Sequence, residues 1–462
     1  MKFINDCDSL LPIEINLPYF NHGSNMCNNH EDLKIDQTTN VLDDSKIYDL
    51  LIIGGGLAGV SYAARANQMG DIDFVVIEKN DSLLNNFIYR TKKINQKVMR
   101  SSYKHHLGPV EQISLADFAR LNYSKLSSGE KSMLERERKG ERAIPSLSTF
   151  LKHSTHIINA NNILGRTYCG EVLEIKEEEN IWCIKTDNKT IKTRKIIFAT
   201  GNEIKEEDLE QSDLKIPVFS ALKNHSNEYL NPNISTVCVN GSGNTAAHIV
   251  YNALTKGKKV HWVLRSELVY RCADIPNEFW RTEGLISFNK LSLSKRMDLL
   301  SDIYHGSAMP EHKNIFRKFI KQKKLFIYEN NMISKIEGKI VHLKSGNTFT
   351  TDILVKSFGL KPASLPKIEP VLETYKGFPV LNDENLEWYK GIYVGSSLAA
   401  LSLGPAAKNI DGMRLAIERI FSDIFINKDE ITYGLLKNRN KWGTFGPIGE
   451  IKEEKNNALQ TR

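Results

Sequence analysis

Two glycine-rich turns are the parts of this chain whose residue types and spacing could do chemistry. The first spans residues 54–59 (GGGLAG) and the second spans residues 241–246 (GSGNTA). Both match G-x-G-x-x-[GA], in which the first glycine permits a tight turn, the second lets the backbone approach a pyrophosphate, and the third allows close helix-strand packing. The following helix then directs unpaired N–H groups and a favourable dipole at the phosphates. Two such turns predict two bound dinucleotides.

The surroundings of the first turn agree with a dinucleotide site. The mainly apolar run 49–53 precedes it, a helix of small residues is predicted over 57–66, and a second strand over 73–77 leads to Glu78. A carboxylate about 20 residues beyond the glycines can accept hydrogen bonds from ribose hydroxyls. We therefore predict a site that contains Gly54, Gly56, Gly59 and Glu78.

The second turn lacks this acidic residue. It follows a strand at 236–240 and leads through a helix to a strand at 260–264, after which Arg265 and Ser266 occupy the place of the acid. A guanidinium can pair with a 2'-phosphate that a carboxylate would repel, so the site is predicted to prefer NADP(H). The alternative is that Arg265 is a solvated residue at a strand end. The predicted contacts are Gly241, Gly243, Asn244 and Arg265, and FAD is then assigned to the first site.

Size and composition indicate a globular protein of more than one domain. The chain has 462 residues, a length that usually requires more than one hydrophobic core. Its composition, 41% hydrophobic and 25% charged, is ordinary for a globular protein. Its formal charge of +7 is spread over lysine-rich segments, so we interpret it as a solvated surface and expect no nucleic-acid partner. The sequence has no signal-like N-terminus and no apolar run of membrane-spanning length, which predicts a cytoplasmic protein without a membrane span.

The cysteines and histidines do not form a metal-binding pattern. Six cysteines occur without any C-x-x-C pair, which argues against a zinc ribbon, a disulfide framework and the dithiol of a thioredoxin-reductase-like enzyme. His105 and His106 are adjacent but lack supporting ligands at metal-binding spacing, so no metal site is predicted. His153 and His156 are expected to form a surface or loop pair.

The order of the predicted elements indicates an internal repeat. Each glycine turn begins a βαβ unit that is followed by an antiparallel excursion and a buried strand ending in glycine, at 195–201 and at 352–359. The predicted fold is therefore α/β, with two Rossmann-like dinucleotide-binding domains, the second inserted in the first. The expected organisation is an N-terminal extension at 1–44, an FAD-binding domain at 45–215 and 361–435, an NADPH-binding domain at 216–360 with a helical insertion at about 275–320, and a C-terminal tail at 436–462.

A short segment ahead of the second turn resembles a family motif. Phe219, His225 and Tyr229 match the linker F-x-G-x-x-x-H-x-x-x-[YFW] of the class B flavin-dependent monooxygenases and their N-hydroxylating relatives, with Ala221 in place of the glycine. These enzymes are two-dinucleotide-binding flavoproteins, and in them the linker couples NADP binding to the domain arrangement. The alternative is that His225 only caps a loop near the domain hinge. Residues 357–359 read Ser-Phe-Gly where the N-hydroxylases have Ala-Thr-Gly, so the chain departs from that branch there.

The resemblance also implies where the flavin would lie. Residues 199–201 look like the strand end that approaches FAD, and residues 391–395 with the helix after 403 look like the closing FAD segment. The loop at 99–109 is expected beside the isoalloxazine ring and the phosphates. The residues that the resemblance adds as cofactor contacts are Arg100, Thr200, Gly201, Gly395 and Gly404. His105, His106 and His225 are the candidate catalytic residues.

The function implied by the resemblance is an FAD-dependent, NADPH-using monooxygenase. NADPH would reduce the flavin, dioxygen would add at flavin C4a, and one oxygen atom of the hydroperoxide would pass to a small nucleophilic substrate, an amine or amino acid by preference. A homo-oligomer is compatible with the sequence. Two alternatives stay open: a flavin reductase that uses NAD(P)H without oxygenation, and a non-catalytic FAD-binding module whose 275–320 helices contact a partner.

Overall fold

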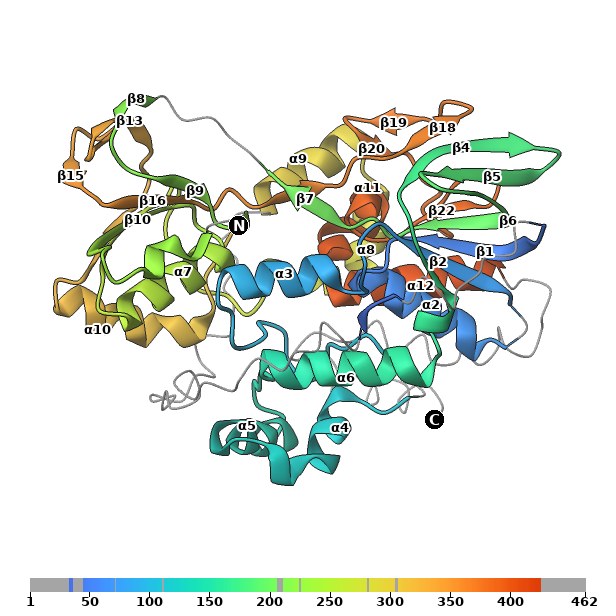
Figure 1. The fold of residues 1–462 in the computed structure, drawn as a ribbon, viewed down its shortest axis with the longest axis horizontal. Helices are drawn as coiled ribbons and strands as arrows, with labels where there is room; N and C mark the ends of the chain where they lie inside the picture. Colours follow the sequence, from blue (N-terminus) through green and yellow to red (C-terminus); the bar gives the residue numbers. More distant parts are fainter. Residues whose placement is uncertain are drawn as a thin grey trace, which may run out of the picture.

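Two parallel β-sheets organise the protein. The computed structural model describes residues 33–35, 45–70, 72–109, 112–205, 211–223, 226–280, 282–303 and 306–424. Figure 1 shows two units side by side, one built around strand β1 and the other around strand β10. We call them the first unit and the second unit.

The first unit has a parallel core. Strand β1 (Ile47–Ile53) pairs with β2 (Phe74–Glu78) on one side and with β6 (Thr190–Phe198) on the other, and β3 (Thr167–Cys169) and β22 (Ile392–Val394) extend the sheet beyond them. All four pairings are parallel. Strand β2 is buried along its whole length, as expected of a sheet covered on both faces.

An antiparallel excursion continues this sheet. Strands β4 (Val172–Glu178) and β5 (Ile181–Thr186) form a hairpin that pairs antiparallel with the start of β6. Strand β18 (Lys367–Glu369) joins β4, and β21 (Glu387–Tyr389) joins β22. The predicted excursion after the first βαβ unit is therefore present.

Helices cover the first sheet and extend to one side of it (Figure 1). The helix that follows β1 is α2 (Leu57–Gln68), and the helix that closes the described chain is α12 (Ile410–Ile424). The other helices of this unit are α3 (Asn85–Lys93), α4 (Leu115–Leu121), α5 (Ser128–Arg138), α6 (Leu147–Ala160) and α11 (Ala400–Leu403). Short 3₁₀ helices lie at Tyr123–Lys125, Leu164–Arg166, Ser226–Leu230, Asn277–Trp280, Pro310–His312, Ser397–Ala399 and Gly404–Lys408.

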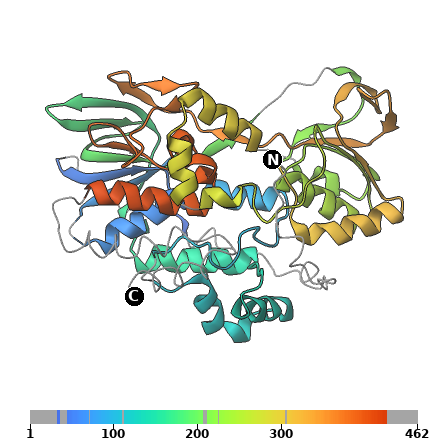
Figure 2. The same ribbon diagram turned by 180° about the vertical axis from the view of Figure 1, so that it is seen from behind.

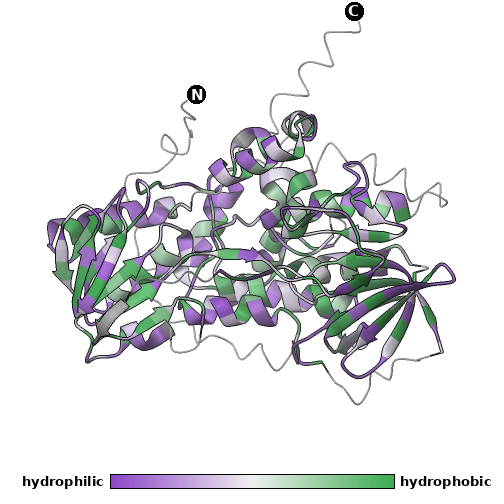
Figure 3. Ribbon diagram, turned by 90° about the horizontal axis from the view of Figure 1, so that it is seen from above, coloured by the Kyte–Doolittle hydropathy of each residue, from purple (hydrophilic) through white to green (hydrophobic). Residues whose placement is uncertain are grey.

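The second unit repeats the plan. Its main sheet is entirely parallel and has the order β12 (Leu325–Tyr328), β11 (Lys259–Val263), β10 (Thr236–Asn240), β16 (Ile353–Lys356) and β9 (Val218–Ser220). Helix α7 (Asn244–Thr255) follows β10, and α10 (Lys313–Lys321) precedes β12. A smaller sheet consists of β15 (Thr348–Thr350), β14 (Ile340–Leu343), β13 (Ile333–Gly338) and β8 (Gln211–Leu214). Figure 3 shows hydrophobic residues in the strands of both units.

The predicted helical insertion divides between the two units. The buried side chains of Phe288 in α8 (Thr282–Asn289) and Leu300 in α9 (Leu293–Ile303) belong to the core of the first unit. Ile315 and Phe316 of α10 belong instead to the core of the second unit. Figure 2 shows α8 and α9, in yellow, beside the red helices α11 and α12.

The chain crosses between the units twice. Strand β7 (Asn202–Ile204) leaves the first unit, β17 (Leu360–Pro362) returns to it, and the two pair antiparallel. The second unit is therefore inserted in the first, which confirms the predicted fold class. Strand β8 pairs with β13 of the second unit, so Gln211–Leu214 lie with that unit although the proposed boundary is at residue 215. A small hairpin of β19 (Thr374–Tyr375) and β20 (Phe378–Pro379) follows the second crossing.

Candidate functional site

The first glycine turn lies at the carboxyl end of β1 and leads directly into α2. Gly54 has a φ of 107°, and a β-carbon there would lie 2.6 Å from the carbonyl oxygen of Ala199. A β-carbon at Gly59 would lie 1.7 Å from the carbonyl oxygen of Gly54, whereas one at Gly56 would meet nothing within 4 Å. The turn is therefore closely packed on the protein side and open on the side where the motif places a pyrophosphate.

Glu78 holds this turn from the neighbouring strand. Its Oε2 accepts a hydrogen bond of 2.6 Å from the backbone N–H of Gly55, and its Oε1 accepts one of 3.0 Å from the N–H of Asn80. The side chain is buried. The carboxylate predicted to meet a ribose thus lies against the glycine turn itself.

The other residues predicted to contact FAD gather at the same edge of the sheet. Thr200 and Gly201 follow β6, and Gly395 follows β22; both strands run parallel to β1, so their carboxyl ends lie together. A β-carbon at Gly395 would lie 1.9 Å from the hydroxyl oxygen of Tyr62. The Oγ1 atom of Thr200 is buried without a hydrogen-bond partner among the described residues, as expected of a group that a ligand satisfies.

The closing segment provides an apolar wall. Gly404 begins the 3₁₀ helix Gly404–Lys408 with a φ of 64°, and a β-carbon there would lie 3.6 Å from side-chain carbons of both Leu285 and Phe288. These two residues belong to α8. Helix α8, from the predicted insertion, therefore packs against the closing segment of the first unit.

His105 connects the loop at 99–109 to helix α12. Its Nδ1 lies 3.0 Å from the hydroxyl oxygen of Ser102, and its Nε2 lies 3.0 Å from Oδ2 of Asp411. Asp411 is buried in the first turn of α12, where the helix dipole favours a carboxylate. Ser102 and Asp411 were missed by sequence reasoning, because no local pattern relates them to each other.

His106 has a different environment from its neighbour. Burial, and then the positive charge of Arg414, hold its pKa well below the usual value of 6.5. Its ring packs edge-on against His153, with the ring centroids 5.2 Å apart. His106 is therefore a neutral histidine of the core, and His105 is the one with polar partners at the sheet edge.

The expectation for His153 is wrong. His153 lies on α6 with no exposed surface, and its Nε2 hydrogen-bonds to the carbonyl oxygen of Ile113 at 2.9 Å. Burial lowers its pKa to about 4. His156 is exposed, as expected. The apolar face of α6 buries residues at helical spacing, and His153 falls on that face.

The second glycine turn has the same construction as the first. Gly241 has a φ of 138°, and a β-carbon there would lie 2.2 Å from the carbonyl oxygen of Ser357. A β-carbon at Gly243 would meet nothing within 4 Å. Asn244 begins α7, and its Oδ1 is buried without a partner among the described residues. This turn therefore also fits a dinucleotide, because the side at Gly243 is open and Oδ1 of Asn244 awaits a partner.

Arg265 lies at the same edge of the second sheet. Its Cζ atom is 5.9 Å from the centroid of the Phe358 ring, and the Nζ atom of Lys356 is 6.0 Å from the same centroid. Two cations thus flank the strand ends next to the turn. Lys356 was missed by sequence reasoning, although its place at the end of a buried strand is visible in the sequence.

The linker segment packs against the second turn's helix. Phe219 lies in β9, and Tyr229 is fully buried near Asn252 of α7. The Nδ2 atom of Asn252 donates a 2.7 Å hydrogen bond to the carbonyl oxygen of Ile94, which follows α3 of the first unit. His225 lies outside the described residues.

Arg100 has protein partners in the second unit. Its guanidinium pairs with Asp274 at 2.7 Å and also donates to Ser307 and to two backbone carbonyl oxygens. The predicted contact with an FAD phosphate stays a prediction. In the structure, the side chain joins the two units.

Residues 33–35, ahead of β1, pair with the loop that follows β2. The backbone N–H of Ile35 donates to Asp81 and that of Leu83 donates to Leu33, at 2.9 and 3.0 Å. Leu33 is fully buried. Leu83 also packs against the first glycine turn, because a β-carbon at Gly55 would lie 2.5 Å from its side chain. Leu83 thus connects residues 33–35 to the back of that turn.

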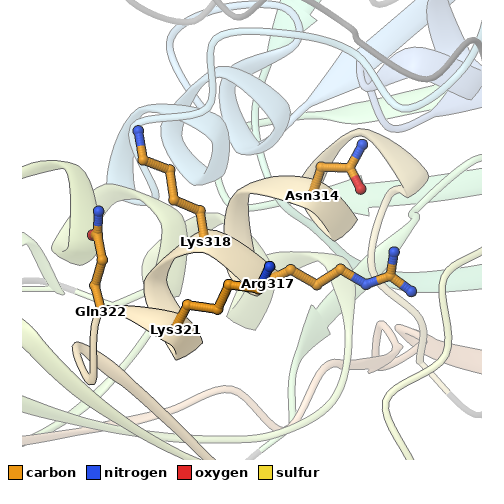
Figure 4. Close-up of a pocket in the computed structure, with 5 residues that line it drawn as sticks. All are labelled: Asn314, Arg317, Lys318, Lys321 and Gln322. Atoms are coloured by element: carbon orange, nitrogen blue, oxygen red, sulfur yellow. The ribbon is translucent and has the colours of Figure 1, made fainter.

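A surface hollow lies away from both turns. It has a volume of about 520 Å³ and is lined by Asn314, Arg317, Lys318, Lys321 and Gln322 (Figure 4). All five residues belong to α10 or to its end, and none is a predicted site residue. Elsewhere, no group of three or more His, Cys, Asp or Glu in the described part of the chain is placed to hold a metal ion. Within that same part, no helix combines the length and apolar character that a membrane span requires.

About half of the chain matches a known protein family. Residues 51–278 match the family described as "Pyridine nucleotide-disulphide oxidoreductase". No curated protein matches the sequence at a significant level.

Solved structures share the whole fold at low sequence identity. The FAD-bound cadaverine monooxygenase of the desferrioxamine pathway from Erwinia amylovora has a TM-score of 0.66 and 15% identity, with 83% of this chain and 96% of that chain covered. The ornithine N-hydroxylase of Kutzneria sp. 744 has a TM-score of 0.65, 15% identity, and coverage of 83% and 100%. The bacillithiol disulfide reductase of Staphylococcus aureus has a TM-score of 0.58, 17% identity, and coverage of 83% and 100%. These likenesses show the fold and extend over nearly the full length of each relative.

Proposed function

We propose that the chain is an NADPH-dependent monooxygenase, an oxidoreductase of the two-dinucleotide-binding flavoprotein class. The match of residues 51–278 to the pyridine nucleotide-disulphide oxidoreductase family supports this proposal. The family binds FAD and a pyridine nucleotide. We place FAD at the first glycine turn and NADPH at the second. The proposed reaction inserts one oxygen atom of dioxygen into a small nucleophilic substrate, with an amine or amino acid preferred.

The observation that carries the assignment of two dinucleotides is the pairing of two glycine turns at the carboxyl edges of two parallel sheets. Gly56 and Gly243 are the open positions of these turns, and Thr200 and Asn244 present unsatisfied polar atoms beside them. Bound FAD supplies the redox chemistry, accepting hydride and reacting with dioxygen once reduced. The chain therefore needs no nucleophile of its own.

The protein residues have binding and shielding roles in this proposal. Glu78 holds the first glycine turn through the N–H of Gly55, while Arg265 and Lys356 would provide positive charge for a 2'-phosphate at the second turn. Leu285 and Phe288 lie against Gly404, where they would exclude water from a flavin bound beside the closing segment. His105 links Ser102 to Asp411 and so holds the loop at 99–109 against helix α12.

The preference for oxygenation over disulfide reduction is supported by the cysteines and the linker. The sequence has no C-x-x-C pair. Of the described cysteines, Cys183 and Cys238 are buried, and burial raises the pKa of each thiol, to about 11 for Cys183. The linker residues Phe219 and Tyr229 match the monooxygenase motif. The amine preference comes from the cadaverine and ornithine enzymes that share the fold.

The test uses the purified FAD-loaded protein. We expect NADPH to bleach the flavin absorbance under anaerobic conditions. In air, we expect an amine from the panel cadaverine, ornithine and lysine to stimulate NADPH oxidation, with a product one oxygen atom heavier by mass spectrometry. Peroxide is measured in parallel, because an uncoupled flavin consumes NADPH without making product.

Each alternative predicts a different result. Thiol formation from an added disulfide, without oxygen uptake, would establish a reductase. A flavin that NADPH does not bleach would remove both enzymatic functions and leave an FAD-binding module.

A further inference from the structure

Two arginine–carboxylate pairs join the units near the second glycine turn. Arg100 of the first unit binds Asp274 through two contacts, Nη1 to Oδ2 at 2.7 Å and Nη2 to Oδ1 at 3.0 Å. Arg142 of the first unit binds Glu311, with Nε 2.8 Å from Oε1. Paired contacts of this kind constrain orientation as well as distance, because the guanidinium and the carboxylate are both planar. The relative position of the units is therefore specified at this interface.

Arg100 has further contacts beyond this pair, and Arg142 in turn donates a 3.1 Å hydrogen bond to the backbone carbonyl oxygen of Arg100. Its Nη2 atom donates a 2.6 Å hydrogen bond to the hydroxyl oxygen of Ser307 and a 3.0 Å bond to the carbonyl oxygen of Arg271. Ser307 itself donates to Asp274 and has almost no exposed surface. Arg100, Asp274 and Ser307 thus form a closed set of hydrogen bonds, which we call the interface cluster.

The residue before Ser307 lies against the second glycine turn. A β-carbon at Gly306 would lie 2.6 Å from Cα of Gly243 and 2.9 Å from its backbone nitrogen. The position that a β-carbon of Gly243 would take is open. Gly306 therefore supports the turn from one side and leaves open the side where the motif places a pyrophosphate.

We propose that Arg100 is a positioning residue that fixes the second glycine turn relative to the first unit, acting through Ser307 and Gly306. The inference rests on the proposed function, because that function assigns NADPH to this turn. The interface cluster holds Ser307 in one place, Ser307 holds Gly306, and Gly306 limits the movement of Gly243. Affinity for NADPH and the approach of the nicotinamide to the flavin consequently depend on a side chain of the first unit.

The experiment compares Arg100→Lys with Arg142→Lys in the FAD-loaded protein. Each variant keeps its positive charge and loses a forked arginine–carboxylate pair at the same interface. The Arg100 side chain donates directly to Ser307, whereas Arg142 donates to the main-chain carbonyl oxygen of Arg100. NADP+ binding is measured by calorimetry, and the rate of anaerobic flavin reduction is measured against NADPH concentration. We expect Arg100→Lys to raise the Kd for NADP+ about tenfold, within the usual range of coupling between sites. Arg142→Lys should leave the Kd within about twofold of the wild-type value.

A second variant keeps the arginine pair intact. Ser307→Ala removes the hydroxyl that connects the cluster to Gly306 and leaves Arg100 bound to Asp274, so we expect it to raise the Kd for NADP+ about fivefold. Flavin content serves as the readout that distinguishes positioning from general loss of structure. It should be unchanged in Ser307→Ala, which leaves the arginine at position 100 in place.

The outcomes separate this inference from the proposed function. Equal effects of Arg100→Lys and Arg142→Lys would overturn the inference, because both would then act only by loosening the interface. A wild-type Kd in both Arg100→Lys and Ser307→Ala would also overturn it, while leaving the proposed function in place. A wild-type protein that binds no NADP+ would overturn the proposed function and this inference together.

Discussion

The Nε2 atom of His105 lies 3.0 Å from Oδ2 of Asp411, and this pair fastens the loop at 99–109 to the first turn of α12. Both residues lie at the carboxyl edge of the first sheet, where the first glycine turn and the closing segment meet. The pair therefore joins two segments that the sequence assigns to the flavin site.

Removing the histidine should leave a buried carboxylate without this partner. We expect His105→Ala to lower the free energy of unfolding by roughly 1–3 kcal/mol, the cost of an unsatisfied buried acceptor. His105→Gln retains a donor and should lose less. Urea unfolding of the two variants checks this, and equal losses would show that the hydrogen bond to Asp411 contributes nothing.

Alanine substitution at Gly59 and at Gly56 should have different effects on the stability of the FAD-free protein. Gly59→Ala places a β-carbon 1.7 Å from the carbonyl oxygen of Gly54, so we expect it to destabilise the protein by roughly 1–3 kcal/mol even without FAD. Gly56→Ala meets no atom of the protein, so thermal stability without FAD should change by less than about 1 kcal/mol. FAD affinity should fall in both. Full FAD affinity in Gly56→Ala would remove the assignment of its open side to a pyrophosphate.

Arg265 should determine the choice of nucleotide. We expect Arg265→Ala to weaken NADPH binding about tenfold to a hundredfold, which corresponds to the loss of one or more hydrogen bonds to a charged group. NADH binding should change little, because NADH has no 2'-phosphate. Steady-state KM values for both nucleotides provide the measurement, and an equal effect on both would contradict the 2'-phosphate assignment.

Buried histidines should make the protein less stable in mild acid. Burial lowers the pKa of His153 to about 4, below its usual value of 6.5, so the unfolded chain binds the proton more readily than the folded one. The stability that His153 contributes is complete above pH 6.5 and is lost as the pH falls toward 4, by up to roughly 3 kcal/mol at about 1.4 kcal/mol per pKa unit. His261 and His312, with pKa values lowered by burial to about 4 and about 3, act in the same direction.

The contribution of His153 to acid sensitivity can be measured from how the melting temperature changes with pH. His153→Gln retains a hydrogen-bond donor and cannot titrate, so its melting temperature should fall less between pH 7 and pH 5 than that of the wild type. His156→Gln, on the exposed side of the same helix, is the matched control. If His153→Gln and His156→Gln have the same slope, His153 does not titrate as its burial implies.

Residues 33–35 should help to retain FAD. Leu33 is fully buried, and it packs with Leu83 behind the first glycine turn. We expect Leu33→Ala to cost roughly 2–5 kcal/mol of local packing and to speed FAD release. Lys34→Ala changes an exposed side chain in the same segment and should release FAD at the wild-type rate. Release is followed by the rise in flavin fluorescence, and identical rates would exclude a role for this segment.

The sequence alone determined the two glycine turns, the strands around them and the insertion of one unit in the other. These features follow from local physics. Gly54 and Gly241 adopt positive φ values that other residues rarely take, and the short apolar runs beside the glycine turns are typical of buried parallel strands. The repeated order of turn, helix, excursion and strand was therefore readable along the chain.

Only the tertiary structure decided which side chains meet. Asp274 lies 174 residues beyond Arg100, and no local pattern identifies it as the partner of that guanidinium. The same holds for the contact of His105 with Asp411, for the packing of α8 and α9 on the first unit, and for the burial of His153. Such contacts depend on how distant elements are brought together, because a side chain's partner is set by the packing of the whole core and not by its neighbours in sequence.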